Sequence, residues 1–137
     1  MNLLCLLSLI ALFAPALSQS QSSAKPAPRT LPLECPSTDC PLLTGAPETA
    51  GLRSGYVRLK PGESVGWHTT AHNEETLVIL HGKGELLIEG SSALAIAERM
   101  AAYVPPATRH NVTASGSEVL EYVYVVAPAG AQTTSAK

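Results

Sequence analysis

The stretch at residues 61–85, PGESVGWHTTAHNEETLVILHGKGE, decides which fold this chain can adopt. It opens on a Pro-Gly turn signal, closes on the turn HGKG, and carries two short apolar runs between them. The polar link between the runs holds His68, His72, Glu74 and Glu75. If the two runs are paired strands, His68 and Glu75 become cross-strand neighbours about 5 Å apart. An imidazole and a carboxylate at that distance can share one divalent metal ion.

The chain beyond Gly51 has the pattern of many short strands. Apolar and polar residues alternate, and turn signals recur at regular spacing, which favours an all-β sandwich or barrel. Residues 93–103 also have helix propensity, but the flanking strands favour two strands joined by a Glu-Arg turn. We expect about eight strands, at residues 52–60, 64–69, 76–80, 85–89, 93–97, 101–104, 110–114 and 119–126.

A second segment, YVPPATRH at residues 103–110, supplies another imidazole in His110. Together the two segments resemble the two conserved motifs of the cupin superfamily. In the first motif, the glycine, first histidine, glutamate and last glycine of the family correspond in spacing to Gly62, His68, Glu75 and Gly82.

The chain departs from the family pattern at several positions. Thr70 stands where the first motif has its second histidine. In the second motif the proline and histidine are kept, as Pro105 and His110, whereas Arg99 and Ala107 replace the two glycines, and the asparagine is replaced as well, by Ala114.

The resemblance covers residues 51–126 and implies a single cupin-type double-stranded β-helix, which is a jelly-roll barrel. It implies that His68, Glu75 and His110 converge inside the barrel as metal ligands. Two imidazoles and one carboxylate suit Fe(II), with Mn, Ni, Cu and Zn as alternatives. The resemblance also implies a homodimer.

Other polar residues near the motifs have open roles. His72 is a candidate fourth ligand in place of the histidine missing at position 70, a candidate acid or base at the mouth, or a residue facing water. Glu74 should lie on the face opposite Glu75 and is a second candidate for moving protons. His81 should be a surface residue, and strand alternation turns Trp67 away from His68 into the core.

The N-terminal region predicts export. Residues 1–18 read as a signal peptide with small residues before the cleavage site, and the apolar run is shorter than the roughly 20 residues that span a bilayer. Residues 19–34 are rich in Ser, Ala and Pro and are expected to be a disordered leader. A cupin domain should follow at residues 35–127, with its core at 51–126 and a flexible tail at 128–137. The protein is expected to be secreted or periplasmic.

The cysteines fit an exported chain. Cys5 falls within the predicted signal peptide, which leaves Cys35 and Cys40 as a close pair. In an oxidising compartment such a pair forms a local disulfide. The rival interpretation is a metal-binding or redox pair, although four residues separate the two thiols instead of the two of a redox motif.

Charge and composition narrow the function classes. Nine basic and eleven acidic residues give a net charge of −2 without a basic run, which excludes an electrostatic nucleic-acid interface. After signal cleavage no apolar run of membrane-spanning length remains. Three classes stay open. The first is a metal-dependent dioxygenase, isomerase or lyase acting on a small organic acid, phenol or sugar. The second is a non-catalytic module that binds a small ligand or metal, and the third is a structural cupin that has lost its metal.

Overall fold

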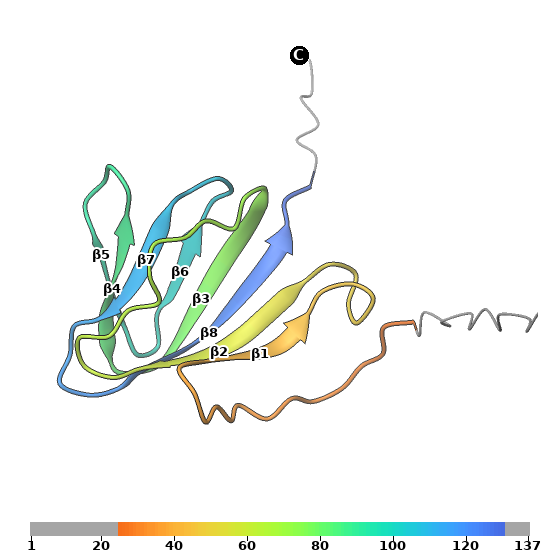
Figure 1. The fold of residues 1–137 in the computed structure, drawn as a ribbon, viewed down its shortest axis with the longest axis horizontal. Helices are drawn as coiled ribbons and strands as arrows, with labels where there is room; N and C mark the ends of the chain where they lie inside the picture. Colours follow the sequence, from red (N-terminus) through yellow and green to blue (C-terminus); the bar gives the residue numbers. More distant parts are fainter. Residues whose placement is uncertain (1–24, 131–137) are drawn as a thin grey trace, which may run out of the picture.

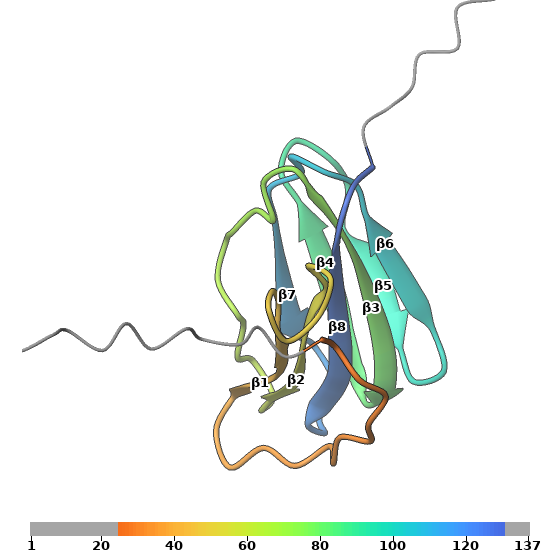
Figure 2. The same ribbon diagram turned by 90° about the vertical axis from the view of Figure 1, so that its right-hand side faces the viewer.

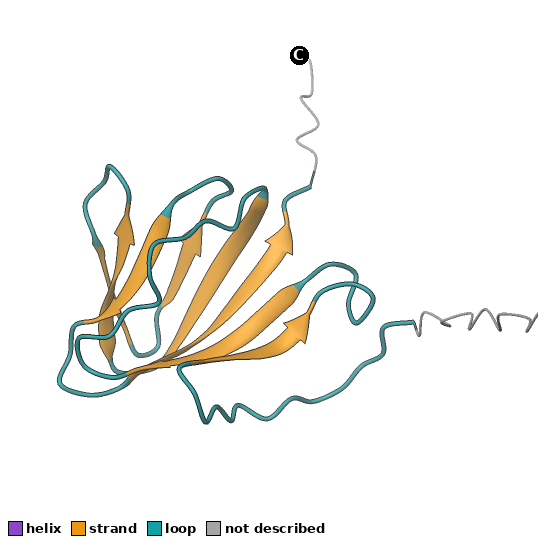
Figure 3. Ribbon diagram, in the orientation of Figure 1, coloured by secondary structure: helices purple, strands orange, loops and turns teal. Residues whose placement is uncertain are grey.

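A computed structural model describes residues 25–130, so the predicted signal peptide lies outside the described residues. Within that range the chain forms eight strands and no helix, hence none that could cross a membrane. The strands, coloured in Figure 3, are β1 (Asp39–Thr44), β2 (Arg53–Leu59), β3 (Asn73–His81), β4 (Lys83–Ile88), β5 (Leu94–Ala97), β6 (Ala101–Val104), β7 (His110–Ala114) and β8 (Leu120–Pro128).

The strands form two antiparallel sheets. Five strands pair in the order β1-β2-β8-β3-β6, and three pair in the order β5-β4-β7. Figures 1 and 2 show the two sheets as the walls of an open-ended barrel, with β1 at the outer edge of the larger sheet. This is the jelly-roll architecture expected from the sequence, and all the named pairings are antiparallel.

The expected strand at residues 64–69 is not a regular strand, and this prediction was wrong. The segment follows β7 with only two isolated bridges, Ser64 to Thr113 and His68 to His110. Gly66 lies between the bridges with a φ of 88°, which breaks the extended conformation of the chain. The segment is therefore an irregular lining of the smaller sheet.

Strand β1 was missed by the sequence analysis. It pairs with β2 from Asp39–Val57 to Thr44–Arg53, with a register shift between Pro41 and Leu43. A proline within a short strand argues against a central position, but an edge strand with a bulge accepts it. The predicted disulfide between Cys35 and Cys40 is present directly at the start of this strand.

The turn between β5 and β6 confirms the strand interpretation of residues 93–103. Arg99 in this turn has a φ of 68°, and Ala107 has a φ of 58°. These are the two positions where the chain lacks the glycines of the second cupin motif. The backbone keeps the left-handed conformation that glycine accepts without strain, although both residues carry a Cβ.

The apolar core fills one end of the barrel and leaves the other end polar. Neighbouring strands β2, β8 and β3 place Val57, Tyr122 and Ile79 on one rung, all of them buried. The rung at the opposite end holds Arg53, Val126 and Glu75 instead. The core cluster consists of Val57, Leu59, Leu77, Ile79, Leu86, Ile96, Val104, Val112, Ala114, Leu120 and Tyr122.

Candidate metal centre

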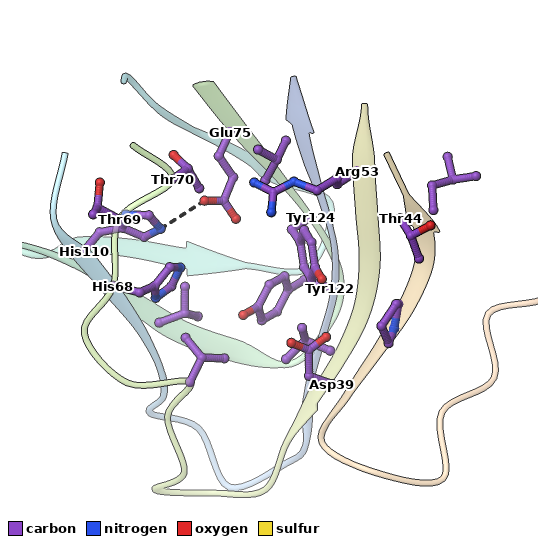
Figure 4. A pocket seen from close by; sticks show the side chains of 16 residues that line it. Asp39, Thr44, Arg53, His68, Thr69, Thr70, Glu75, His110, Tyr122 and Tyr124 are labelled. Atoms are coloured by element: carbon purple, nitrogen blue, oxygen red, sulfur yellow. Dashed lines mark ion pairs between the residues drawn. The ribbon is translucent and has the colours of Figure 1, made fainter. Parts of the chain in front are cut away.

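Three side chains meet at the polar end of the barrel. His68 comes from the loop before β3, Glu75 from β3 and His110 from the first position of β7 (Figure 4). One potential ligand atom from each of the three lies within 4.8 Å of the others. His110 Nε2 is 3.1 Å from Glu75 Oε2, and the two imidazole centroids are 4.3 Å apart. The structure therefore brings together the three residues that the motif spacing singled out.

The route by which they meet differs from the expected hairpin. His68 pairs with His110, and the backbone N–H of each donates to the carbonyl of the other at 2.9 Å. Glu75 is instead opposite Val104 on one side and Val126 on the other. The expectation that His68 and Glu75 are cross-strand neighbours was wrong, because the chain preceding β3 follows the smaller sheet. The cluster thus joins the two sheets.

Both imidazoles are oriented by backbone carbonyls. The Nδ1 atom of His68 lies 2.9 Å from the Gly66 carbonyl oxygen, and that of His110 lies 3.0 Å from the Thr108 carbonyl oxygen. A carbonyl oxygen can only accept, so each Nδ1 carries a hydrogen and the neutral ring has its lone pair on Nε2. Histidines that bind metals through Nε2 are held by this same outer hydrogen bond.

The facing atoms of the buried pair within the cluster have only each other as partners. Glu75 and His110 are 5% and 1% exposed, and Oε2 and Nε2 face each other at 3.1 Å with no further hydrogen-bond partner among the described residues. They form an ion pair when His110 is protonated, and two acceptors face each other when the ring is neutral. Burial on its own would lower the pKa of His110, but the Glu75 carboxylate and the Thr108 carbonyl outweigh it, so the pKa is raised. When the ring is neutral, the two facing acceptors are without a donor, and a buried polar atom in that state costs about 1–3 kcal/mol. A divalent first-row transition metal ion fits this nitrogen and oxygen donor set.

The other candidates from the sequence lie outside this cluster. His72 is exposed and is not one of the grouped residues. Thr70 is buried, and its hydroxyl donates to the Asn73 carbonyl at 2.9 Å. Glu74 lies on the outer face, as expected, and accepts a hydrogen bond of 3.0 Å from the Tyr103 hydroxyl.

The sequence-based prediction of side-chain burial or exposure was wrong for Trp67 and is confirmed for His81. Trp67, expected in the core, is 43% exposed, and its ring faces the guanidinium of Arg109 at 5.4 Å. Strand alternation does not hold in the irregular segment around Gly66, which explains the error. His81 is exposed and lies 3.5 Å from a carboxylate oxygen of Glu98, so the prediction of a surface residue is confirmed.

The cluster opens into a cavity of about 430 Å³ between the sheets. Sequence reasoning did not find the polar residues that line it away from the metal ligands. The period-2 pattern of β2 could have placed Arg53 on the inward face with Val57, but Asp39 requires the unrecognised strand β1. Figure 4 shows these side chains around the cavity: Asp39, Thr44, Arg53, Thr69, Tyr122 and Tyr124.

Burial changes the acidity of the cavity residues. Burial raises the pKa of Asp39, and the opposing effects of the His68 charge and the Tyr124 hydroxyl do not cancel it. Burial likewise raises the pKa of Tyr124, assisted by the charges of Asp39 and Glu75. Of the described residues, Asp39 is the one lining carboxyl outside the metal cluster, and its pKa is raised although the residue as a whole is exposed.

Comparisons with known proteins agree with this architecture. The cupin domain family matches residues 55–126. A cupin family protein of double-stranded β-helix fold from Methanocaldococcus jannaschii is similar in structure, with a TM-score of 0.63, 20% identity, and coverage of 74% of this chain and 91% of that chain. A conserved protein with a double-stranded β-helix domain from Klebsiella pneumoniae has a TM-score of 0.62 and 23% identity, covering 77% and 94% of the two chains.

The cupin domain of Schizosaccharomyces pombe Cnp3 is a third similar structure, with a TM-score of 0.59 and 20% identity. The alignment covers 66% of this chain and 64% of that chain, which is less than two thirds of the yeast domain. At these identities the likeness is one of fold. No protein of curated function matches the chain in sequence.

Proposed function

Because this chain belongs to the cupin domain family, we propose that it holds one divalent transition metal ion through His68, Glu75 and His110 and binds a small organic molecule in the adjoining cavity. The observation that carries this proposal is the convergence of one ligand atom from each residue within 4.8 Å, around a buried pair, Glu75 Oε2 and His110 Nε2, that has no further hydrogen-bond partner among the described residues. A metal ion between these atoms and His68 Nε2 would satisfy all three. Fe, Mn, Ni, Cu and Zn are all compatible with the ligand set.

The chemistry available depends on which groups reach the cavity. A bound divalent metal supplies a Lewis acid that polarises an oxygen atom of a ligand. The Asp39 carboxyl, whose pKa burial raises, is placed to hold or release a proton at the cavity wall. This arrangement supports a metal-dependent enzyme of the dioxygenase, isomerase or lyase class.

A non-catalytic binding module is the second candidate function, and one observation favours it. The two residues expected to move protons, His72 and Glu74, do not line the cavity. Glu74 is instead bonded to Tyr103 on the outer face of the sheet. In this alternative the metal and the cavity hold a ligand without converting it. A structural cupin without metal is the remaining alternative, which the threonine at position 70 favours.

Metal loading tests the proposal directly. Protein purified without chelators and then loaded with each of the five metals should contain about one ion per chain by elemental analysis. His68→Ala or His110→Ala should abolish most of that binding, because each removes one of three ligands. His81→Ala is the matched control, since this exposed histidine faces Glu98 away from the cluster. Absence of bound metal with all five ions would leave only the structural alternative.

We also propose that the chain is exported, cleaved near Gln19, and folded as one domain from residue 35 onward. The disulfide between Cys35 and Cys40 supports an oxidising compartment. Intact-mass analysis of protein from its native compartment, with and without reductant, should give the mature N-terminus and a mass difference of one disulfide. Two free thiols in that sample would contradict export to such a compartment.

The homodimer implied by the cupin family is a further part of the proposal. The outer face of the five-stranded sheet exposes Val78 and Leu80 on β3 and Tyr103 on the neighbouring edge strand β6. Exposed apolar side chains gathered on one face are typical of an interface. Light scattering coupled to size exclusion should give the dimer mass, whereas a monomer at all concentrations would refute this part.

A further inference from the structure

Arg53 differs from most arginines of the described chain in lacking an acidic partner. Arg29, Arg58 and Arg109 each pair with a glutamate at 2.6–2.9 Å. Arg53 and Arg99 form no such pair among residues 25–130, and of these two exposed residues only Arg53 lines the cavity beside the candidate metal ligands. A guanidinium is always charged at physiological pH, so this one, at the cavity wall, is free to pair with an anion that enters the cavity.

The sheet register places Arg53 level with the metal ligand Glu75. Both residues are opposite Val126, one from β2 and the other from β3. Two strand spacings put their Cα atoms about 10 Å apart on the same inner face. Figure 4 shows the Arg53 side chain reaching from β2 across this interval toward Glu75. An anion held by the guanidinium therefore lies next to the metal position.

Two glycines shape this part of the cavity. A Cβ on Gly45 would lie 3.3 Å from Arg53 Cγ, so the stem of Arg53 packs closely along the turn after β1. A Cβ on Gly55 would lie 2.5 Å from the ring of Tyr124, so the ring occupies the space that a side chain on Gly55 would fill. The result is an aromatic wall beside the guanidinium, with Val65 and Val112 among the other lining residues.

The charge balance of the loaded cavity also favours an anion. The two positive charges of a bound metal and the one of Arg53 exceed the single negative charges of Glu75 and Asp39. The volume of about 430 Å³ is that of a small-molecule site. Its partly apolar wall suits a molecule with an apolar body and disfavours a bare inorganic anion.

We propose that Arg53 is the anion-recognition residue of the cavity and that the ligand is a small organic carboxylic acid. The carboxylate pairs with the guanidinium beside the metal, and the apolar body packs against the ring of Tyr124. This inference rests on the proposed metal-binding function and narrows its ligand class.

Benzoate and benzamide, which share their shape and differ in charge, provide the test. Calorimetric titration of the metal-loaded protein should show benzoate binding about ten- to hundredfold more tightly, the range expected for charge-assisted hydrogen bonds. Arg53→Gln should remove most of this preference without changing the metal content. Arg53→Lys should fall between them, because lysine keeps the charge but not the two-pronged geometry. The control is Arg58→Gln, which alters the outward face of the same strand and should behave as wild type.

The outcomes separate this inference from the metal proposal. The same titrations on metal-free protein should retain a smaller preference that depends on Arg53, because the guanidinium is a fixed charge. Metal binding without any preference for benzoate, or with a preference that survives in Arg53→Gln, overturns the inference and leaves the metal proposal standing. If the protein binds no metal but prefers benzoate in a way that depends on Arg53, the metal proposal is overturned and the role of Arg53 in anion recognition stands. Inorganic phosphate binding more tightly than benzoate would also overturn the carboxylate assignment.

Discussion

Gly55→Ala should close part of the cavity while leaving the metal centre intact. The added methyl would lie 2.5 Å from Cε1, Cζ and the hydroxyl oxygen of Tyr124, about 1 Å closer than ordinary contact. Gly55 is opposite Tyr124 in the pairing of β2 with β8, so the collision cannot be avoided by a small shift of the methyl. The side chain that can move is the ring of Tyr124, and the open space beside it is the cavity.

The magnitude follows from two opposing effects. Overpacking usually costs about 1–3 kcal/mol, whereas replacing glycine by alanine in a compatible backbone stabilises by about 0.4–1 kcal/mol through the unfolded chain. Because the ring can turn into empty space, we expect a net loss near the low end, about 1 kcal/mol. In a domain of this size that lowers the Tm by about 4–8 °C.

The assay combines denaturation with binding. Guanidinium unfolding should give the modest stability loss, elemental analysis should give unchanged metal content, and benzoate affinity should fall at least tenfold. Tyr124→Leu removes the ring with which the added methyl collides. In that background Gly55→Ala should therefore no longer lower stability, so the double variant should be at least as stable as Tyr124→Leu alone. A stability loss above about 3 kcal/mol would mean that the ring cannot turn. Unchanged benzoate affinity would mean that the ring does not bound the ligand space, and either result refutes the reasoning.

Three further predictions concern the ligand set, pH and the backbone. If His72 ligates the metal, His72→Ala should weaken metal binding by more than the ten- to hundredfold typical of outer contacts. Because His72 is exposed, we expect instead that the metal affinities of His72→Ala and wild type are nearly equal. In that case Thr70→His should tighten metal binding. The pKa of His110 is raised from 6.5, so its protonated form stabilises the metal-free fold below that pH, and this stability should be lost as pH rises through the folded-state pKa. Metal affinity should increase over the same range, because the metal binds the deprotonated imidazole. Denaturation midpoints of the metal-free protein and metal titrations across this range measure the two trends. If stability and metal affinity both rise, or both fall, with pH, the prediction is contradicted. Ala107→Gly should stabilise the fold by up to about 1 kcal/mol, because glycine accepts the positive φ at this position without strain. The control Ala101→Gly, in the extended strand β6, should destabilise the fold by about 0.5–1 kcal/mol. A lower Tm for Ala107→Gly than for Ala101→Gly would refute this prediction.

The fold was accessible from the sequence where local pattern and tertiary pairing agree. Alternation and turn signals placed β2 to β8 well, because those strands bury one face and carry their own turns. The pattern failed at β1, where Pro41 and a bulge interrupt the alternation of an edge strand. It also failed around Gly66, because a positive φ converts an apparent strand into an irregular loop.

The site was accessible only in the part that motif spacing encodes. His68, Glu75 and His110 follow from two short segments, although the pairing that brings His68 beside His110 does not. The alternation of β2 could have placed Arg53 on the inward face, but Asp39 carries no local signal, and the relation of both residues to Glu75 arises from the register of β1, β2, β8 and β3. The buried pair of Glu75 and His110 likewise exists only once the sheets are assembled.

The cupin domain match begins at residue 55, within β2, and so omits Asp39 and Arg53. Both lie within residues 39–53, a segment that includes the edge strand β1. The Cys35–Cys40 disulfide links the start of this strand to the chain before it. Closing so short a loop is worth about 2 kcal/mol. This segment forms one wall of the cavity and contains none of the metal ligands. We therefore expect that grafting residues 35–53 from another cupin, cysteines included, would change which molecules bind while leaving the metal ligands in place.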